Sequence, residues 1–163
     1  MDSKLFSAIK IENTILKNRI IVAPMCQYSA VNGSATNWHL MHLGQFSISG
    51  AGLVFVEATA VNKLGRITSG CLGIWSKENE IELRKVVKFT KEFGNSKIGI
   101  QLSHSGRKGS THLPWNGGKP ILAQEKEGWE TVAPSAIPYS NDAPLPKELS
   151  QSDLNTIKYD FVT

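Results

Sequence analysis

A thiol and a phenol follow the first of three apolar runs in this chain, small residues close the second, and an amide side chain follows the third. Cys26 and Tyr28 lie in the segment Ala23-Pro24-Met25-Cys26-Gln27-Tyr28, after the first run. Ala60 belongs to the small residues that close the second run, and Gln101 follows the third. Enzymes built on βα units carry their sites at the carboxyl ends of parallel strands. We therefore expect one shared site, with a polarisable thiol and an amide that both donates and accepts hydrogen bonds.

Alternating strands and helices must position these residues. The pattern predicts, in order, a strand at 19–24, a helix through 38–43 capped by Thr36 or Asn37, a strand at 53–58, a helix between Ser76 and Gly94, and a strand at 97–102. The continuous apolar run of the second strand is typical of a parallel strand that is buried on both faces. This order indicates a parallel α/β sheet. Two short strands, 5–9 and 14–16, precede it as a hairpin around Glu12-Asn13.

Residues 105–148 interrupt this alternation with many Gly, Pro, Asn and Ser residues. A connection of this length is usually a binding loop or a lid rather than filler. Ser150 and Asp153 then form a capping box for a third helix, whose apolar spacing continues to Thr163 without a C-cap.

Three strands do not close a barrel, because a (β/α)8 barrel needs eight strands and about 250 residues. The predicted fold is therefore α/β, the N-terminal part of a TIM (β/α)8 barrel with about three βα units preceded by a β-hairpin, and incomplete. We divide residues 1–163 into a hairpin cap (1–17), three strands with two helices (18–104), a long active-site loop (105–148) and the start of a third helix (149–163).

Composition excludes several classes of protein. The chain is 40% hydrophobic and 20% charged, which is ordinary for a globular protein. Its net charge of +4 comes from dispersed lysines and arginines, which argues against a nucleic-acid partner. No window is apolar enough for a membrane span, and Cys26 and Cys71 make no disulfide framework. We expect a cytoplasmic protein without a nucleic-acid or membrane partner.

Six segments in register resemble the N-terminal part of the Old Yellow Enzyme family, the FMN-dependent NAD(P)H oxidoreductases and ene-reductases. They are Pro24-Met25-Cys26-Gln27-Tyr28, Val56-Glu57-Ala58-Thr59-Ala60-Val61, Gly65-Arg66-Ile67-Thr68, Gly73-Ile74-Trp75-Ser76, Gln101-Leu102-Ser103-His104-Ser105-Gly106-Arg107-Lys108 and Thr131-Val132-Ala133-Pro134-Ser135-Ala136-Ile137. With its cysteine after Pro24-Met25, the chain is similar to the bacterial branch that includes xenobiotic reductases and NADPH dehydrogenases.

The resemblance implies an FMN cofactor that takes hydride from NADPH or NADH and passes it to an activated alkene such as an enone. Carried over by position, the cofactor-binding residues would be Ala23, Pro24, Met25, Cys26, Ala60 and Gln101, and Tyr28 would contact the substrate. Ala60 would offer a backbone contact near a flavin carbonyl, and Gln101 would bind the pyrimidine edge. The family's His pair and its proton-donating tyrosine belong to a fourth strand, so this chain carries no catalytic residue of that set. The resemblance also implies a homo-oligomeric full-length form.

Other polar residues have plainer explanations. His39 and His42 share a helix face, but no Cys, Asp or Glu completes a metal set, so packing is favoured and no metal is expected. Glu57 more often pairs with a basic neighbour than catalyses, and Cys71 fits a structural role. The group His104, Arg107 and Lys108 could bind an anion or anchor a loop by salt bridges.

Two functions from different classes follow. The chain is part of a flavin-dependent ene-reductase, or it is a non-catalytic remnant that interacts through its open sheet edge. Compatible residues at every flavin-facing position favour the first.

Overall fold

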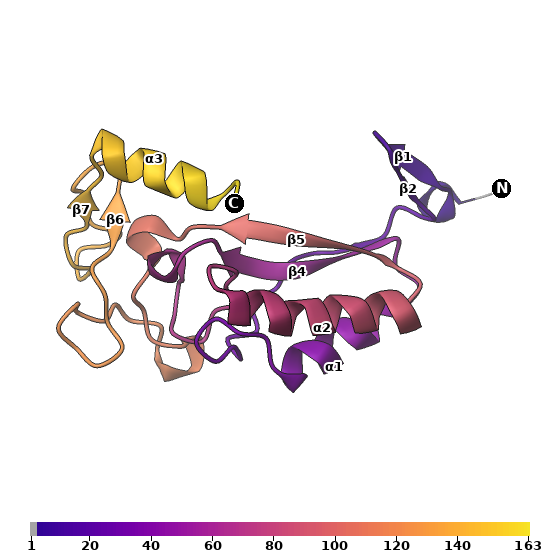
Figure 1. Cartoon of the computed structure of the whole chain (residues 1–163), viewed down its shortest axis with the longest axis horizontal. Coiled ribbons are helices and arrows are strands. Elements are labelled where there is room, and N and C mark those ends of the chain that lie inside the picture. The colour runs from indigo at the N-terminus through magenta and orange to yellow at the C-terminus, as the bar shows by residue number, and fades with distance from the viewer. Residues whose placement is uncertain (1–2) are drawn as a thin grey trace.

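The computed structural model describes residues 3–163, and a three-stranded parallel sheet forms its centre (Figure 1). Its strands are β3 (Ile21–Val22), β4 (Leu53–Ala60) and β5 (Lys97–Ser103), in the order β3-β4-β5. Ile21 pairs with Leu53, and Leu53 pairs in turn with Lys97. The predicted parallel sheet is confirmed. The first strand is shorter than expected, because ladder pairing covers only two residues of the segment 19–24.

Two helices, α1 (Asn37–Ser47) and α2 (Lys77–Phe93), cover one face of this sheet (Figure 1). Thr36, rather than Asn37, is the N-cap of α1 and forms a capping box with His39. Ser76 accepts a hydrogen bond from the Asn79 amide at the start of α2, and Gly94 ends that helix, both as predicted. The apolar core lies between these helices and β4 and comprises Ala30, Ala35, Leu43, Ala51, Val54, Val56, Leu72, Leu83 and Val86.

A β-bulge interrupts the pairing of β4 with β5 near the carboxyl end of the sheet. Val56 pairs with Ile100 and Ala58 with Gln101, so Glu57 is the extra residue on β4. A bulge re-aims the side chain at its position. Here it turns the Glu57 carboxylate toward α1, where His39 lies.

The predicted hairpin is present at the amino end of the sheet, opposite the long loop (Figure 1). It consists of β1 (Ile9–Ile11) and β2 (Thr14–Leu16), which pair antiparallel around Glu12 and Asn13. The expectation of a strand at 5–9 is wrong. Lys4–Phe6 forms a short 3-10 helix, η1, whose turn is closed by hydrogen bonds from the Ser7 amide and hydroxyl to the Lys4 carbonyl.

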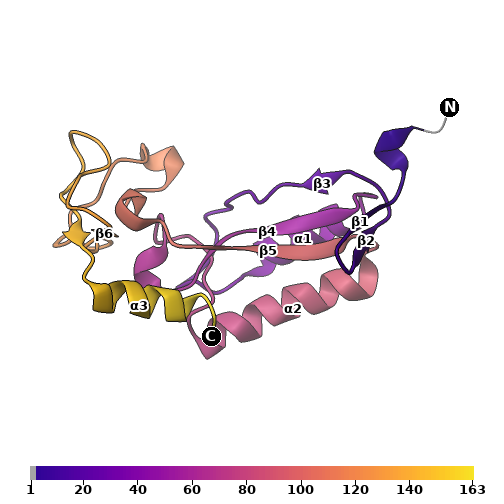
Figure 2. The same cartoon turned by 90° about the horizontal axis from the view of Figure 1, so that it is seen from above.

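The segment after β5 carries little regular structure and lies beyond the carboxyl ends of β4 and β5 (Figure 2). Its elements are η3 (Gly106–Lys108), η4 (Pro114–Asn116), β6 (Val132–Ala133) and β7 (Lys147–Glu148), and another short helix, η2 (Lys63–Gly65), follows β4. The strands β6 and β7 pair in parallel and close the loop between them.

The third helix, α3, spans Gln151–Asp160 and begins with the predicted capping box of Ser150 and Asp153. The expectation that this helix runs uncapped to Thr163 is wrong, because Phe161 is its C-cap and donates to the Ile157 and Tyr159 carbonyls. No helix within residues 3–163 combines the length and apolar character needed to cross a membrane.

Candidate functional site

The loop after β3 carries the thiol and the phenol, and its middle residue, Gln27, fastens it to two other elements. The Gln27 amide N–H donates to Oε2 of Glu57 on β4 over 3.2 Å. Its side-chain Oε1 accepts a bond from Nε1 of Trp38 on α1 at 3.0 Å, and its Nε2 donates to the Met25 carbonyl at 2.7 Å. The first two bonds hold the loop against β4 and α1, and the third lies within the loop itself.

Tyr28 occupies a backbone conformation that an L-residue adopts at a cost. Its φ is +52°, in the left-handed region, which costs about 1–2 kcal/mol for a non-glycine residue. Gly70 packs so closely that a Cβ added there would lie 2.6 Å from the Tyr28 carbonyl oxygen. The Tyr28 ring meets Trp115 edge-on, with ring centroids 5.9 Å apart. Burial raises the pKa of the Tyr28 hydroxyl, with smaller contributions from Cys26, Cys71 and Glu57.

Cys26 is half-buried in the same loop and is not in a disulfide. Burial, followed by the charge of Glu57, raises the pKa of its thiol to about 11. A smaller effect of Cys71 acts in the same direction, while the Ala58 amide and Lys108 oppose it. The thiol is therefore a neutral S–H group at physiological pH. It can donate a weak hydrogen bond but is a poor nucleophile, because the thiolate is the reactive form.

Glu57 and His39 form a buried pair behind this loop. Their side chains are 3% and 2% exposed, and His39 Nε2 lies 3.3 Å from Glu57 Oε1. The expected pairing of Glu57 with a basic residue is confirmed, and the packing role of His39 agrees with its burial in α1. Within residues 3–163, no three His, Cys, Asp or Glu residues gather into a possible metal site.

The remaining candidate residues lie on β4 and β5. Gln101 pairs with Ala58 across the two strands, and Ala60 pairs with Ser103. Gln101 is exposed, so its amide is available to a ligand. Ala60 is 1% exposed, its amide N–H donates to the Leu72 carbonyl at 2.9 Å, and its carbonyl accepts from the Ile74 amide at 3.0 Å. Ala60 therefore has no free N–H, and its methyl group is buried as well.

The three strand ends thus lie at one edge of the sheet, as the sequence predicts. Pro24 and Cys26 are partly buried, whereas Ala23 and Met25 are exposed. Sequence reasoning missed the aromatic support of the loop by Trp38 and Trp115. Trp115 lies in the long loop at 105–148, and nothing in the sequence indicates its contact with Tyr28.

The basic residues after β5 anchor the long loop without a salt bridge in the described part of the chain. Arg107 donates to the Ile137 carbonyl at 2.9 Å, and the Lys108 ammonium lies 5.8 Å from the Tyr139 ring centroid. His104 Nδ1 accepts the Gly106 amide, and burial lowers the pKa of this imidazole. Cys71 is structural, since its sulfur accepts the Thr68 amide in a buried turn.

The model of the NADH:flavin oxidoreductase / NADH oxidase family matches residues 4–163. The chain belongs to this family. Among its family relatives, an NADH:flavin oxidoreductase of Gibberella zeae is 44% identical over 98% of this chain. An NADPH dehydrogenase of a Geobacillus species is 42% identical over 94% of it. The chain spans 39% and 41% of the length of these two relatives.

The crystal structure of Old Yellow Enzyme from a Pichia species has the same fold. It superimposes with a TM-score of 0.82 at 23% identity and covers 99% of this chain, which in turn covers 41% of that enzyme. The fold prediction is confirmed: this part of the family's barrel provides three βα units preceded by a hairpin.

The residues at the carboxyl edge fit the flavin for which the family is named. A neutral thiol and an exposed amide with donor and acceptor suit a planar ring with alternating carbonyl and N–H groups. The chemistry of this donor set agrees with family membership.

Proposed function

We propose that this chain forms the N-terminal part of an FMN-dependent NAD(P)H oxidoreductase that reduces activated alkenes such as enones. The observation that carries the proposal is the parallel order β3-β4-β5, which puts the segment with Cys26 and the strand residues Ala60 and Gln101 toward one edge of the sheet. Family membership and the flavin and NADPH chemistry in the names of the relatives support it.

FMN would accept hydride from NADPH or NADH and deliver it to the alkene; the residues of this chain would bind and orient. Ala23, Pro24 and Met25 would line the ring, with Cys26 donating a weak S–H bond that tunes its electronics. Gln101 would hydrogen-bond the polar ring edge. Ala60 would leave room for the ring, since its N–H is already bonded. Tyr28 would lie on the substrate side.

The same proposal includes the roles of the segments. Residues 1–17 cap the barrel, 18–104 carry the ring-facing residues, 105–148 form the active-site loop and 149–163 include the third helix. The full-length form would be a homo-oligomer that binds a small alkene. A reducing cytoplasm agrees with two cysteines that are both free.

A hybrid barrel tests the proposal. In this hybrid, residues 1–163 take the place of the region of the Geobacillus NADPH dehydrogenase to which they are 42% identical. They are joined to the part of that enzyme that follows the matched region. The purified hybrid should be yellow, release FMN on denaturation, and bleach with NADPH under anaerobic conditions. Re-oxidation by cyclohexenone should restore the colour. A soluble hybrid without flavin absorbance after incubation with excess FMN would refute the proposal.

A further inference from the structure

The buried pair of His39 and Glu57 has no part in the function proposed above. Both side chains are almost completely inaccessible to solvent, at 2% and 3% exposure. Burying a carboxylate is expensive unless hydrogen bonds and a partner compensate it. An apolar pair would pack the same space without that cost, so the position of the pair calls for an explanation.

The hydrogen bonds around His39 determine its tautomer. The Thr36 backbone amide donates to His39 Nδ1 at 2.9 Å, so Nδ1 carries a lone pair and no proton. The proton of the neutral ring is therefore on Nε2, which faces Glu57 Oε1 at 3.3 Å. His39 transmits the fixed position of the α1 N-terminus to the carboxylate.

The second oxygen of Glu57 holds the loop that carries the thiol. Oε2 accepts the Gln27 amide N–H at 3.2 Å, and that amide belongs to the peptide directly after Cys26. The bulge at Glu57 is what brings the carboxylate to this peptide rather than into the ladder with β5. The resulting chain of contacts runs from Thr36 through His39 and Glu57 to Gln27.

We propose that His39 and Glu57 are positioning residues that fix the peptide after Cys26 and place a carboxylate beside its thiol. The consequence is that Cys26 stays a neutral S–H donor and resists alkylation and oxidation. The pKa of about 11, raised by burial first and by Glu57 second, agrees with this role. The effect of a neutral Cys26 thiol on a bound flavin rests on the proposed function, whereas the position of the Glu57 carboxylate does not.

Other charged or titratable groups also face this pair and this thiol. Three groups act on the Cys26 thiol: Glu57 on β4, Cys71 in the turn that follows, and Lys108 in η3. Glu57 faces His39 and His42 on α1, and burial lowers the pKa of His42. Lys108 acts against Glu57, so the pKa of the thiol reflects both groups.

The test measures the pH dependence of Cys26 alkylation by iodoacetamide, followed by mass spectrometry of the peptide that carries it. Apo protein without FMN is used, both as the 163-residue chain and as the hybrid barrel. At pH 8 a thiol with a pKa of about 11 is ionised to about one part in a thousand. Its alkylation rate in the parent protein should rise steadily between pH 7 and pH 10.

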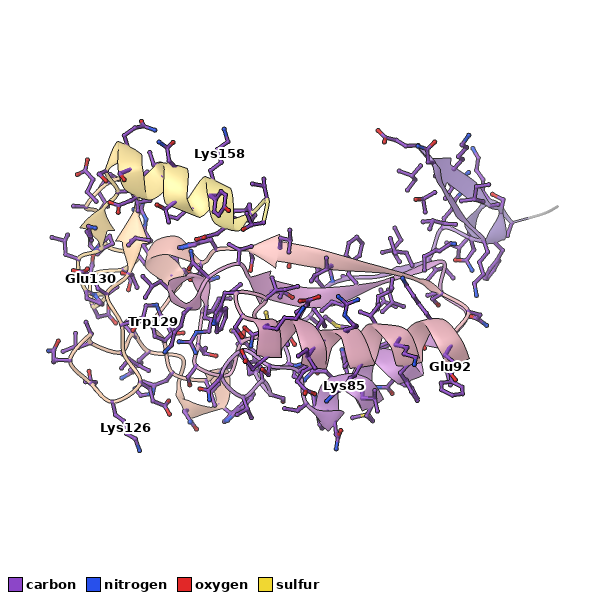
Figure 3. The ribbon with its side chains drawn as sticks, viewed as in Figure 1. Lys85, Glu92, Lys126, Trp129, Glu130 and Lys158 are labelled. Atoms are coloured by element: carbon purple, nitrogen blue, oxygen red, sulfur yellow. The ribbon has the colours of Figure 1, made fainter. Side chains whose placement is uncertain are left out.

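Glu57→Gln removes the carboxylate, and His39→Leu removes the imidazole that lies 3.3 Å from it. Each should raise the alkylation rate at pH 8 about tenfold, which corresponds to a thiol pKa lower by about one unit, and the profile should begin to level below pH 10. His39→Gln keeps an acceptor and a donor and should retain the parent profile. Glu92→Gln is the matched control, because Glu92 is exposed at the far end of α2 (Figure 3).

Profiles of Glu57→Gln and His39→Leu that superimpose on the parent profile would overturn the proposal. So would a rise by the same factor that continues to pH 10 without any levelling, because that reports only greater access to the loop. Circular dichroism checks folding, and if His39→Leu does not fold, Glu57→Gln decides. A hybrid that lacks flavin but shows the shifted profile would refute the proposed function and leave this inference intact.

Discussion

Arg66 should hold the long loop against the body of the protein through its guanidinium. The residue is 8% exposed, and its guanidinium carbon lies 4.8 Å from the Trp129 ring centroid and 5.5 Å from that of Trp75. Its Nε donates to the Lys63 carbonyl at 2.9 Å, and Nη1 donates to the Ser69 carbonyl at 3.4 Å. No carboxylate pairs with it in the described part of the chain, and burial lowers the pKa of this group. Stacking on two rings is therefore its main compensation.

The magnitude for Arg66→Met follows from these contacts. Two partly desolvated cation–π contacts contribute about 1 kcal/mol each. The hydrogen bond from the charged Arg66 Nε to the Lys63 carbonyl adds about 1.5 kcal/mol. Methionine recovers some of this, because it fills the gap and removes the cost of burying a charge. We expect the loop to open more easily by about 2 kcal/mol, which is about a 30-fold change in its opening equilibrium.

Hydrogen exchange at Trp129 reports this opening directly. The Trp129 amide donates to the buried hydroxyl of Ser110 at 3.0 Å, and its indole N–H donates to the Leu64 carbonyl at 3.1 Å. Arg66→Met should accelerate exchange of this amide about 30-fold, while Arg66→Lys, which keeps the charge without a planar group, should give a smaller increase. Lys126→Met is the control, since Lys126 projects into solvent from the same loop (Figure 3). Exchange in Arg66→Met within threefold of the parent would refute the stacking argument.

Four further outcomes are expected. In the hybrid barrel, Cys26→Ala should shift the flavin reduction potential and leave FMN bound, as spectroelectrochemistry would measure, because the contact is electronic. Gln101→Ala should weaken FMN binding about 10-fold in a fluorescence titration, since it leaves ring atoms unpaired at about 1–3 kcal/mol; unchanged affinity would mean that Gln101 does not face the ring. Residues 1–163 alone should not retain FMN and should self-associate in sedimentation, because within residues 3–163 β3 and β5 each have an unpaired edge; a monomer that retains flavin would contradict this. The chain should lose stability as pH falls below about 6.5, because burial lowers the pKa of His104 and the unfolded state then binds more protons; His104→Gln should flatten that slope in urea titrations at pH 5 and 7.

Local signals explain how much of the fold was predictable. The caps at Ser76 and Ser150 and the stop at Gly94 depend on a few neighbouring residues, and each appears as expected. The apolar run of β4 needs only its own composition to indicate a buried parallel strand. The strand expected at 5–9 failed because apolar residues in a short segment do not distinguish a strand from a 3-10 turn. The end of α3 was missed because an αR C-cap at Phe161 has no glycine to mark it.

The candidate site was predictable in its location and not in its supports. Strand ends gave the positions of Cys26 and Gln101 at one edge of the sheet. The bulge at Glu57 arises from a register shift between two strands, which no single-strand pattern contains. The same holds for Ala60, whose N–H is taken up by Leu72 in a bridge formed only in three dimensions. Contacts between distant parts of the chain therefore decide what each site residue can offer.

Several contacts that position the proposed cofactor-binding residues lie within the described part of this chain. Gln27 holds the Cys26 loop through Glu57 and Trp38, Ala60 is fixed by bonds to the segment after β4, and Gln101 is fixed by its pairing with that strand. This chain nevertheless spans only about two fifths of the relatives' length. Positioning that is internal to the chain should survive joining to a different remainder, because the joined part does not supply it. A hybrid barrel that binds flavin would then report on the residues of this chain, and the Cys26 and Gln101 variants would report on its ring-facing edge.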